Sequence, residues 1–201
     1  TAGTYTIYVF AQSGTVPNCT QEASFTITVN QTPATPNPAD VTVCESNGYI
    51  LPALAAGQTY HSAPGGSAAT QIAAGTNINT VGANTIYIFS QTGTTPNCTS
   101  EADFVVNVSA APIADAPSNV ASCDSYVLPF LNSGTYYSGP GGTGTSYAGG
   151  DVITASMTMY VFAQTGTSPN CTDENSFTID IFYSPVALAP SDIHVCDDNN
   201  D

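Results

Sequence analysis

The sequence has 201 residues, with 15 Asp and Glu, two His and neither Lys nor Arg, so its formal charge at neutral pH is −15. Without cationic side chains a protein cannot displace the counterions of nucleic-acid phosphates, and anionic lipid does not attract it. Schiff-base lysines, Walker-type phosphate loops and arginine fingers are excluded as well. Because the apolar runs are all too short for a membrane-spanning helix, we expect no direct membrane insertion, and we expect no nucleic-acid partner.

The composition nevertheless indicates a folded protein. Apolar residues make up 42% of the chain, and 11 Tyr and 8 Phe provide large side chains for a core. Disordered acidic chains usually have few aromatic and β-branched residues, and this sequence has many.

The chain is built from internal repeats. A segment reading TYTIYVFAQSGTVPNCTQEASFTITV from Thr4 returns from Asn84 and from Met157, and a second block containing a cysteine also occurs three times. The cysteines of the two blocks recur with the same two spacings, at positions 19, 98 and 171 and at positions 44, 123 and 196. We therefore expect a piece of a longer array, with Pro-rich joints between repeats. The predicted domains are the end of one repeat, two complete repeats and the start of another, at 1–31, 33–109, 112–183 and 186–201.

Each repeat is predicted to consist of short β-strands. Thr, Val, Ile, Tyr and Phe are frequent, and Gly, Pro, Asn and Ser interrupt them at short intervals. Segments such as FTITV from Phe25 alternate apolar and polar residues, as a strand with one solvated face does. The preceding segment, such as IYIFSQ from Ile86, is apolar on both faces and should be a central strand. About seven strands in 73–79 residues predict an immunoglobulin-like β-sandwich, and we expect no amphipathic helix of useful length.

Two cysteines per repeat predict structural disulfides. A domain of this size buries only about 60% of its chain surface, and a disulfide closing about 50 residues would add roughly 3–4 kcal/mol of stability. Disulfides also imply an oxidising compartment, and hence an extracellular location.

Two pairing schemes are open. Pairing within a repeat would join Cys44 to Cys98 and Cys123 to Cys171, leaving Cys19 and Cys196 for partners outside this sequence. Pairing across the joints would give three bonds of equal sequence separation, namely 19–44, 98–123 and 171–196. The constant sequence separation of these cysteine pairs favours the second scheme. We favour the first, because the last strand of a sandwich usually runs beside the first strand.

Three blocks carry a resemblance to a known group of proteins. They are the DVxVC…YxLPxL block, the YYSGPGG turn, and the TIYVFAQTGTxPNCTxExSFT block, which is the most specific. Together they resemble repeats in very large surface proteins of gliding Bacteroidota, which look like cell-surface adhesins exported by the type IX secretion system. The resemblance covers the whole chain. It implies tandem Ig-like modules at a Gram-negative cell surface and a role in adhesion or gliding, but it supplies no catalytic or ligand residues.

Acidic residues offer a weak candidate metal site. Glu22, Glu101 and Glu174 recur three residues after a cysteine, and Asp173 precedes the last of them. Carboxylates without competing cations can collect Ca²⁺. No EF-hand or nonapeptide calcium motif is present, so a solvated acidic face is the simpler interpretation. We expect no other cofactor, since His61 and His194 do not recur and no C-x-x-C spacing supports a zinc site.

The function hypotheses are a structural stalk and a ligand-binding repeat. In the first, the repeats contact neighbouring repeats of the same chain or filament, and regions outside this sequence bind the cell-surface or substratum ligand. In the second, Tyr60, Tyr136 and Tyr137 beside the Gly-rich turn bind sugar or another surface ligand. Packing beneath that turn is the simpler interpretation for these tyrosines. We expect no enzyme, because the cysteines recur without a recurrent histidine and the Gly-rich stretches lack a lysine.

Overall fold

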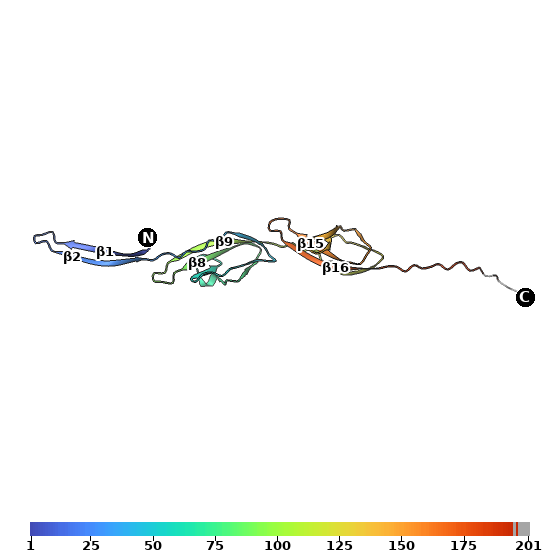
Figure 1. Cartoon of the computed structure of the whole chain (residues 1–201), viewed down its shortest axis with the longest axis horizontal. Helices are drawn as coiled ribbons and strands as arrows, with labels where there is room; N and C mark the ends of the chain where they lie inside the picture. Colours follow the sequence, from blue (N-terminus) through green and yellow to red (C-terminus); the bar gives the residue numbers. More distant parts are fainter. Residues whose placement is uncertain (195, 197–201) are drawn as a thin grey trace. The chain divides into compact units, whose positions relative to one another are not determined.

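The structure is a computed structural model, and it describes residues 1–194 and 196. The chain divides into two compact units, which Figure 1 traces by residue colour. The first unit comprises Thr1–Ala110 together with Thr167–Cys171, and the second comprises Ala111–Gly166 and the residues from Thr172 onward. Of the predicted repeat start at 186–201, residues 195 and 197–201 lie outside the described residues. No helix among the described residues is long and apolar enough to cross a membrane.

The first unit begins with a hairpin. Strands β1 (Gly3–Gln12) and β2 (Thr20–Val29) pair antiparallel and form a two-stranded sheet of their own (Figure 1). Phe25, Ile27 and Val29 are 52%, 45% and 44% exposed, although their sequence pattern is that of core residues. The hairpin exposes them because no further strand of the described residues covers it.

Seven strands follow in the first unit and form a sandwich-like pair of sheets. The larger sheet has the order β3-β9-β8-β5-β6, and β4 pairs with β7 in the smaller one. One short 3₁₀ helix, η1 (Ala68–Thr70), precedes β6. The strands are β3 (Val41–Cys44), β4 (Tyr49–Ile50), β5 (Gln58–His61), β6 (Gln71–Ile72), β7 (Asn77–Ile78), β8 (Gly82–Gln91) and β9 (Thr99–Ser109).

The second unit repeats this topology strand for strand. Its larger sheet has the order β10-β16-β15-β12-β13, and β11 pairs with β14. The predicted all-β, immunoglobulin-like sandwich with about seven strands per repeat is therefore confirmed. The strands are β10 (Val120–Cys123), β11 (Tyr126–Val127), β12 (Thr135–Gly139), β13 (Thr143–Tyr147), β14 (Val152–Ile153), β15 (Met157–Gln164) and β16 (Thr172–Phe182).

The cores follow from the alternating pattern. Phe104, Val106 and Val108 of β9 point inward and are at most 4% exposed, as their spacing predicts. Ile86 and Ile88 of β8 pack against them, and β8 lies between β9 and β5, so its prediction as a central strand is confirmed. Each fully buried side chain of this size contributes about 1.5–3 kcal/mol. The second core is built in the same way around Phe177 and Ile179.

The first strand of each sandwich lies beside the last strand, but the two run parallel. Cys44 of β3 is therefore the register partner of Ser109, at the far end of β9. Cys98 immediately precedes β9, at its opposite end. At about 3.3 Å per residue these two places are roughly 36 Å apart, and a disulfide requires Cα atoms within about 7 Å.

The predicted pairing within a repeat is therefore wrong for this structure. Cys123 is likewise the register partner of Phe182, whereas Cys171 precedes the opposite end of β16. Instead, Cys44 is bonded to Cys171, with a Cα–Cα distance of 5.5 Å, and both residues belong to the first unit. The alternative scheme across the joints is not formed either. The remaining cysteines, Cys19, Cys98, Cys123 and Cys196, are thiols.

Candidate functional site

The cysteine of the PNCT block is carried by a loop with its own hydrogen-bond network, which we call the cysteine loop (12–19, 91–98 and 164–171). In the second copy the Thr92 N–H donates to the Cys98 carbonyl at 3.0 Å, and the Cys98 N–H donates to the Thr92 hydroxyl at 3.0 Å. The Asn97 carboxamide accepts from the Gly93 N–H at 3.0 Å and donates to Gln91 at 3.2 Å. Asn97 thus organises the loop.

The first copy closes in the same way, which shows that the loop folds from its own residues. The Ser13 N–H donates to the Cys19 carbonyl at 2.9 Å, and the Asn18 carboxamide accepts from the Gly14 N–H at 3.3 Å. Gly14 has φ 67°, a left-handed conformation that suits glycine. The same hydrogen bonds therefore fix the position of the cysteine within the loop in both copies.

The cysteine loops of the second and third copies lie against equivalent backbone positions. The Cys171 Sγ lies 4.0 Å from the Ser109 carbonyl oxygen, at the end of β9. The Cys98 Sγ lies 4.0 Å from the carbonyl oxygen of Asn30, which directly follows β2. Asn30 and Ser109 hold the same position in successive repeats. The Asn30 carboxamide also donates to the Pro96 carbonyl at 3.2 Å.

The recurrent glutamates hold a Gly-rich turn in each unit. The Glu101 carboxylate accepts from the Gly65 N–H at 2.7 Å, and Glu174 accepts from the Gly141 N–H at 2.5 Å. We call these turns, Pro64–Gly66 and Pro140–Gly142, the glycine turns. Their last glycine lies over an aromatic ring of the central strand, Phe89 in the first unit. The recurrence of glutamate and of the glycine pair thus has one structural explanation.

The structure does not bring the candidate calcium ligands together. Glu101 and Glu174 are engaged by the glycine turns, and the Asp173 carboxylate accepts from the Ala114 N–H at 2.8 Å. Glu22 lies exposed on β2, in a hairpin that has no glycine turn. In the part of the chain that the structure describes, no three His, Cys, Asp or Glu side chains are grouped so as to hold a metal ion.

The two histidines have unrelated environments. His61 is 2% exposed, with its Nε2 2.8 Å from the Thr59 hydroxyl and its Nδ1 3.0 Å from the Ser67 carbonyl oxygen. Its ring packs edge-on against Phe89, with centroids 6.1 Å apart. His194 is exposed. The buried polar network around His61 is specific to the first unit and was not indicated by any sequence motif.

Two of the three candidate ligand tyrosines are core residues. Tyr60 and Tyr136 are 2% and 1% exposed, and the Tyr136 hydroxyl donates to the Pro129 carbonyl at 3.1 Å. Burial raises the pKa of both phenols, and nearby Tyr49 adds to the rise for Tyr60. A ligand cannot reach either ring, so these two candidates are corrected to packing residues. Tyr137 is the one that remains partly exposed.

Tyr137 belongs to an aromatic cluster on the outer face of the larger sheet in the second unit. It is the register partner of Tyr160, and its ring meets Phe162 edge-on with centroids 6.3 Å apart. We call Tyr137, Tyr160 and Phe162 the outer aromatic cluster. His61, Tyr87 and Phe89 occupy the same three positions in the first unit.

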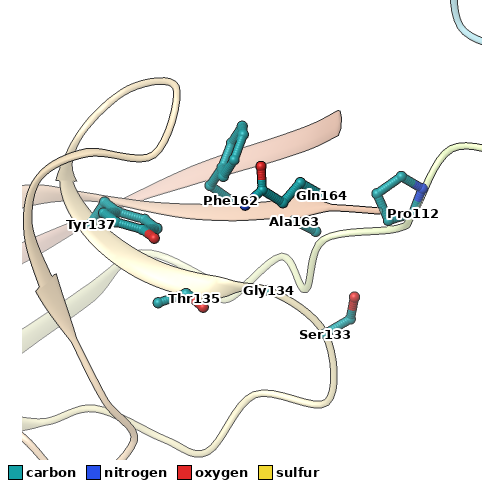
Figure 2. A pocket seen from close by; sticks show the side chains of 8 residues that line it. All are labelled: Pro112, Ser133, Gly134, Thr135, Tyr137, Phe162, Ala163 and Gln164. Atoms are coloured by element: carbon teal, nitrogen blue, oxygen red, sulfur yellow. The ribbon is translucent and has the colours of Figure 1, made fainter. Parts of the chain in front are cut away.

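An open hollow of about 230 Å³ adjoins this cluster. Figure 2 shows Phe162 and Gln164 on the same face of β15, with Pro112 at one end and Tyr137 toward the other. Aromatic faces beside hydroxyl and amide groups suit a small polar ligand. The remaining lining residues are Ser133, Gly134, Thr135 and Ala163.

The fold and these sites define tandem immunoglobulin-like β-sandwich repeats. No protein-family model matches the sequence, and no curated protein matches it. Among solved structures, cadherin domains 3–6 of protocadherin gamma B2 are 12% identical over 90% of this chain and 59% of that chain, with a TM-score of 0.30. Mouse cadherin-23 EC22–24 is 12% identical over 89% of this chain and 74% of that chain, with a TM-score of 0.28.

Drosophila N-cadherin EC1–4 is 11% identical over 90% of this chain and 58% of that chain, with a TM-score of 0.31. The chain thus spans less than two thirds of the protocadherin and N-cadherin fragments. Likenesses of this size support no argument about function.

Proposed function

We propose that this chain is a structural segment of a long extracellular adhesin, a stalk of Ig-like repeats that holds a distal binding region away from the cell. The proposed modules are 33–109 and 112–183, with 1–31 and 186–201 belonging to flanking modules. The observation that carries the proposal is the Cys44–Cys171 disulfide, which joins one sequence repeat to the next. Such a bond needs an oxidising compartment. Because it links successive repeats covalently, it can form only in a protein with tandem repeats.

The contacts that the recurrent polar residues make support a structural role. The glutamates and glycines that recur hold turns, and the asparagine before each free loop cysteine organises its loop. Repeated residues of this kind preserve a shape and supply no chemistry, so we propose that the segment is not an enzyme.

The uniform charge suits a surface filament. With no cation to offset 15 carboxylates, neighbouring segments repel each other at short range, within a screening length of about 8 Å at physiological salt. The resemblance to surface proteins of gliding Bacteroidota extends the proposal to export by type IX secretion, to a Gram-negative cell surface and to a role in adhesion or gliding motility. The ligand on the cell or substratum would then be bound by regions outside this sequence.

Electron microscopy of the native full-length protein, with antibody raised against residues 33–183, tests the proposal. We expect label on intact cells along a thin beaded fibre. Trypsin should leave the labelled segment uncut because it contains no Lys or Arg, whereas chymotrypsin should remove it. Label that requires permeabilised cells, or label on a compact particle, would overturn the proposal.

The outer aromatic cluster and its hollow favour a second function, in which the repeats themselves bind a glycan. A glycan array probed with residues 1–201 and with Tyr137→Ser would test it. Tyr183→Ser is the matched control, because Tyr183 is 75% exposed and does not line the hollow. Binding that is lost in Tyr137→Ser and kept in the control would establish this function. Absence of binding by the unaltered chain would exclude it for the glycans tested.

A further inference from the structure

The six cysteines fall into two structural classes. Cys19, Cys98 and Cys171 end a cysteine loop, and we call them loop cysteines. Cys44 and Cys123 end the first strand of a sandwich, and Cys196 has the same sequence position, so we call these strand-end cysteines. The Cys44–Cys171 disulfide joins a strand-end cysteine to the loop cysteine of the following repeat, 127 residues later.

We infer that every remaining thiol is one half of the same kind of bond with a neighbouring copy of the repeat. Cys19 and Cys98 bond to strand-end cysteines of preceding copies, and Cys123 and Cys196 bond to loop cysteines of following copies. This inference rests on the proposed array of repeats. It predicts a ladder of disulfides in which each complete repeat is bonded once backward and once forward, and no bond lies within a repeat.

The position of Cys98 is the first support. Its Sγ lies 4.0 Å from the Asn30 carbonyl oxygen, just as that of Cys171 lies 4.0 Å from the equivalent Ser109 oxygen. At Ser109 the first strand of the sandwich, β3, pairs with β9 and places Cys44 opposite Ser109. At Asn30 no such strand is present among the described residues, since β2 pairs with β1 alone. Cys98 is therefore in place for a bond whose partner strand a preceding copy would supply.

The position of Cys123 is the second support. It is the register partner of Phe182, as Cys44 is of Ser109. The residue after each cysteine donates its N–H to the carbonyl of that partner at 2.9 Å, in both units. Bonded Cys44 is 7% exposed, whereas Cys123, at the same register position beside the last strand, is exposed. The exposed thiol of Cys123 thus corresponds to the sulfur through which Cys44 is bonded to the loop cysteine Cys171.

The chemistry of each bond is an ordinary two-electron oxidation. Two thiols lose two protons and two electrons as the S–S bond forms, and a disulfide oxidant takes these up and becomes two thiols. Oxidised glutathione can serve as that oxidant in the experiment below. The partner cysteine can come from the same chain or from a second chain, and the arms of the experiment separate these sources.

The test adds one copy of residues 129–183 after Asp201, which completes the repeat that starts at 186 and adds one loop cysteine, the copy of Cys171. After oxidation and alkylation, a non-reducing Glu-C and chymotrypsin digest is read by mass spectrometry. We expect two disulfides, Cys44–Cys171 and Cys123 with the copy of Cys171, while Cys19, Cys98 and Cys196 are alkylated. A bond between Cys196 and the added cysteine, or an alkylated Cys123, would overturn the inference.

Two controls complete the design. In the extended chain, Cys123→Ser should leave the added cysteine fully alkylated and Cys44–Cys171 unchanged. The unextended chain, oxidised at rising concentration, tests a second chain as the source. Linked dimers that join a loop cysteine to a strand-end cysteine support the ladder and assign it to separate chains, whereas pairs of like cysteines contradict it. The disulfide pattern is measured on purified protein, whereas the stalk function is tested on cells. A negative result for one is therefore distinguishable from a negative result for the other.

Discussion

One position in the two cores shows how a single polar atom affects stability. Ser90 is 1% exposed, and its hydroxyl has no hydrogen-bond partner among the described residues. The same position in the second unit is Ala163, which is 5% exposed. The site therefore accepts a methyl group, and the serine hydroxyl is buried there without compensation.

We expect Ser90→Ala to raise the free energy of unfolding of the first unit by about 1 kcal/mol, since an unsatisfied buried hydroxyl costs about that much. Urea denaturation followed by circular dichroism would measure it. The reverse change in the second unit, Ala163→Ser, is the matched control and should lower stability by a similar amount. A loss of stability in Ser90→Ala would show that the hydroxyl does have a partner.

Asp124 gives the second unit a pH-dependent contact. Its carboxylate accepts from the Ser184 N–H at 2.8 Å and from the Ser184 hydroxyl at 2.6 Å. The hydroxyl bond, followed by the backbone bond, lowers the pKa of Asp124 below its usual 3.8. A carboxyl whose pKa is lowered by folding stabilises the fold above its unfolded pKa, and this contribution is lost as the pH falls through the folded pKa.

An NMR titration of the Asp124 carboxyl carbon should therefore show a midpoint below 3.8. Ser184→Ala should move the midpoint upward, because it removes the hydroxyl bond, which is the largest of the contributions that lower the pKa. An unchanged midpoint in Ser184→Ala would assign the shift to the backbone N–H alone.

At the scale of elements, the glycine turn depends on its two glycines for different reasons. Gly65 has φ 92°, and a Cβ there would meet nothing within 4 Å. Gly66 has φ 63°, and a Cβ there would lie 2.6 Å from the Phe89 ring. The first position needs only a left-handed backbone, whereas the second also needs room above an aromatic side chain.

Gly65→Ala should cost about 1 kcal/mol of unfolding free energy, as expected for an alanine in a left-handed conformation. Gly66→Ala should cost roughly 1–3 kcal/mol more, because the ring or the turn must move. Thermal denaturation of both variants would separate the two effects. Equal losses would mean that the turn shifts freely and that Phe89 does not support it.

The sequence predicted the strands well because their signals are local. Alternation identified the inward residues of β9, and apolar residues on both faces identified β8 as central. It did not indicate the direction in which β3 runs beside β9, which depends on long-range packing. That one direction places Cys44 at the opposite end of the sandwich from Cys98, and this is why the pairing within a repeat was wrong.

The roles of the candidate site residues were only partly predicted, for a related reason. Recurrence indicated that the glutamates, the glycine pair and the tyrosines matter, but not what they contact. Glu101 and Gly65 are far apart in the sequence and meet only because β9 and β8 bring the glutamate beneath the turn. Tyr137 lies one residue further along its strand than the residue equivalent to Tyr60. Because successive side chains of a strand point to opposite faces, Tyr60 lies in the core and Tyr137 on the outer face.

At the scale of the whole molecule, the Cys44–Cys171 bond changes which part of the chain carries mechanical load. When the two ends are pulled apart, tension passes from Cys44 through the sulfur atoms to Cys171, and the residues between them are bypassed. The bypassed length is set by the sequence separation of 127 residues, or about 440 Å of extended chain at roughly 3.5 Å per residue.

Single-molecule force spectroscopy should therefore record a contour length about 440 Å shorter under oxidising conditions than after reduction. Cys44→Ser should give the longer value without a reductant, and equal lengths in all three cases would show that the bond does not bear load. The bypassed residues include nearly all of the first sandwich, whereas β16, which carries Phe177 and Ile179 of the second core, lies beyond Cys171 and remains under load. In the proposed stalk, this disulfide limits how far drag can extend the chain, because the residues between Cys44 and Cys171 cannot be drawn out.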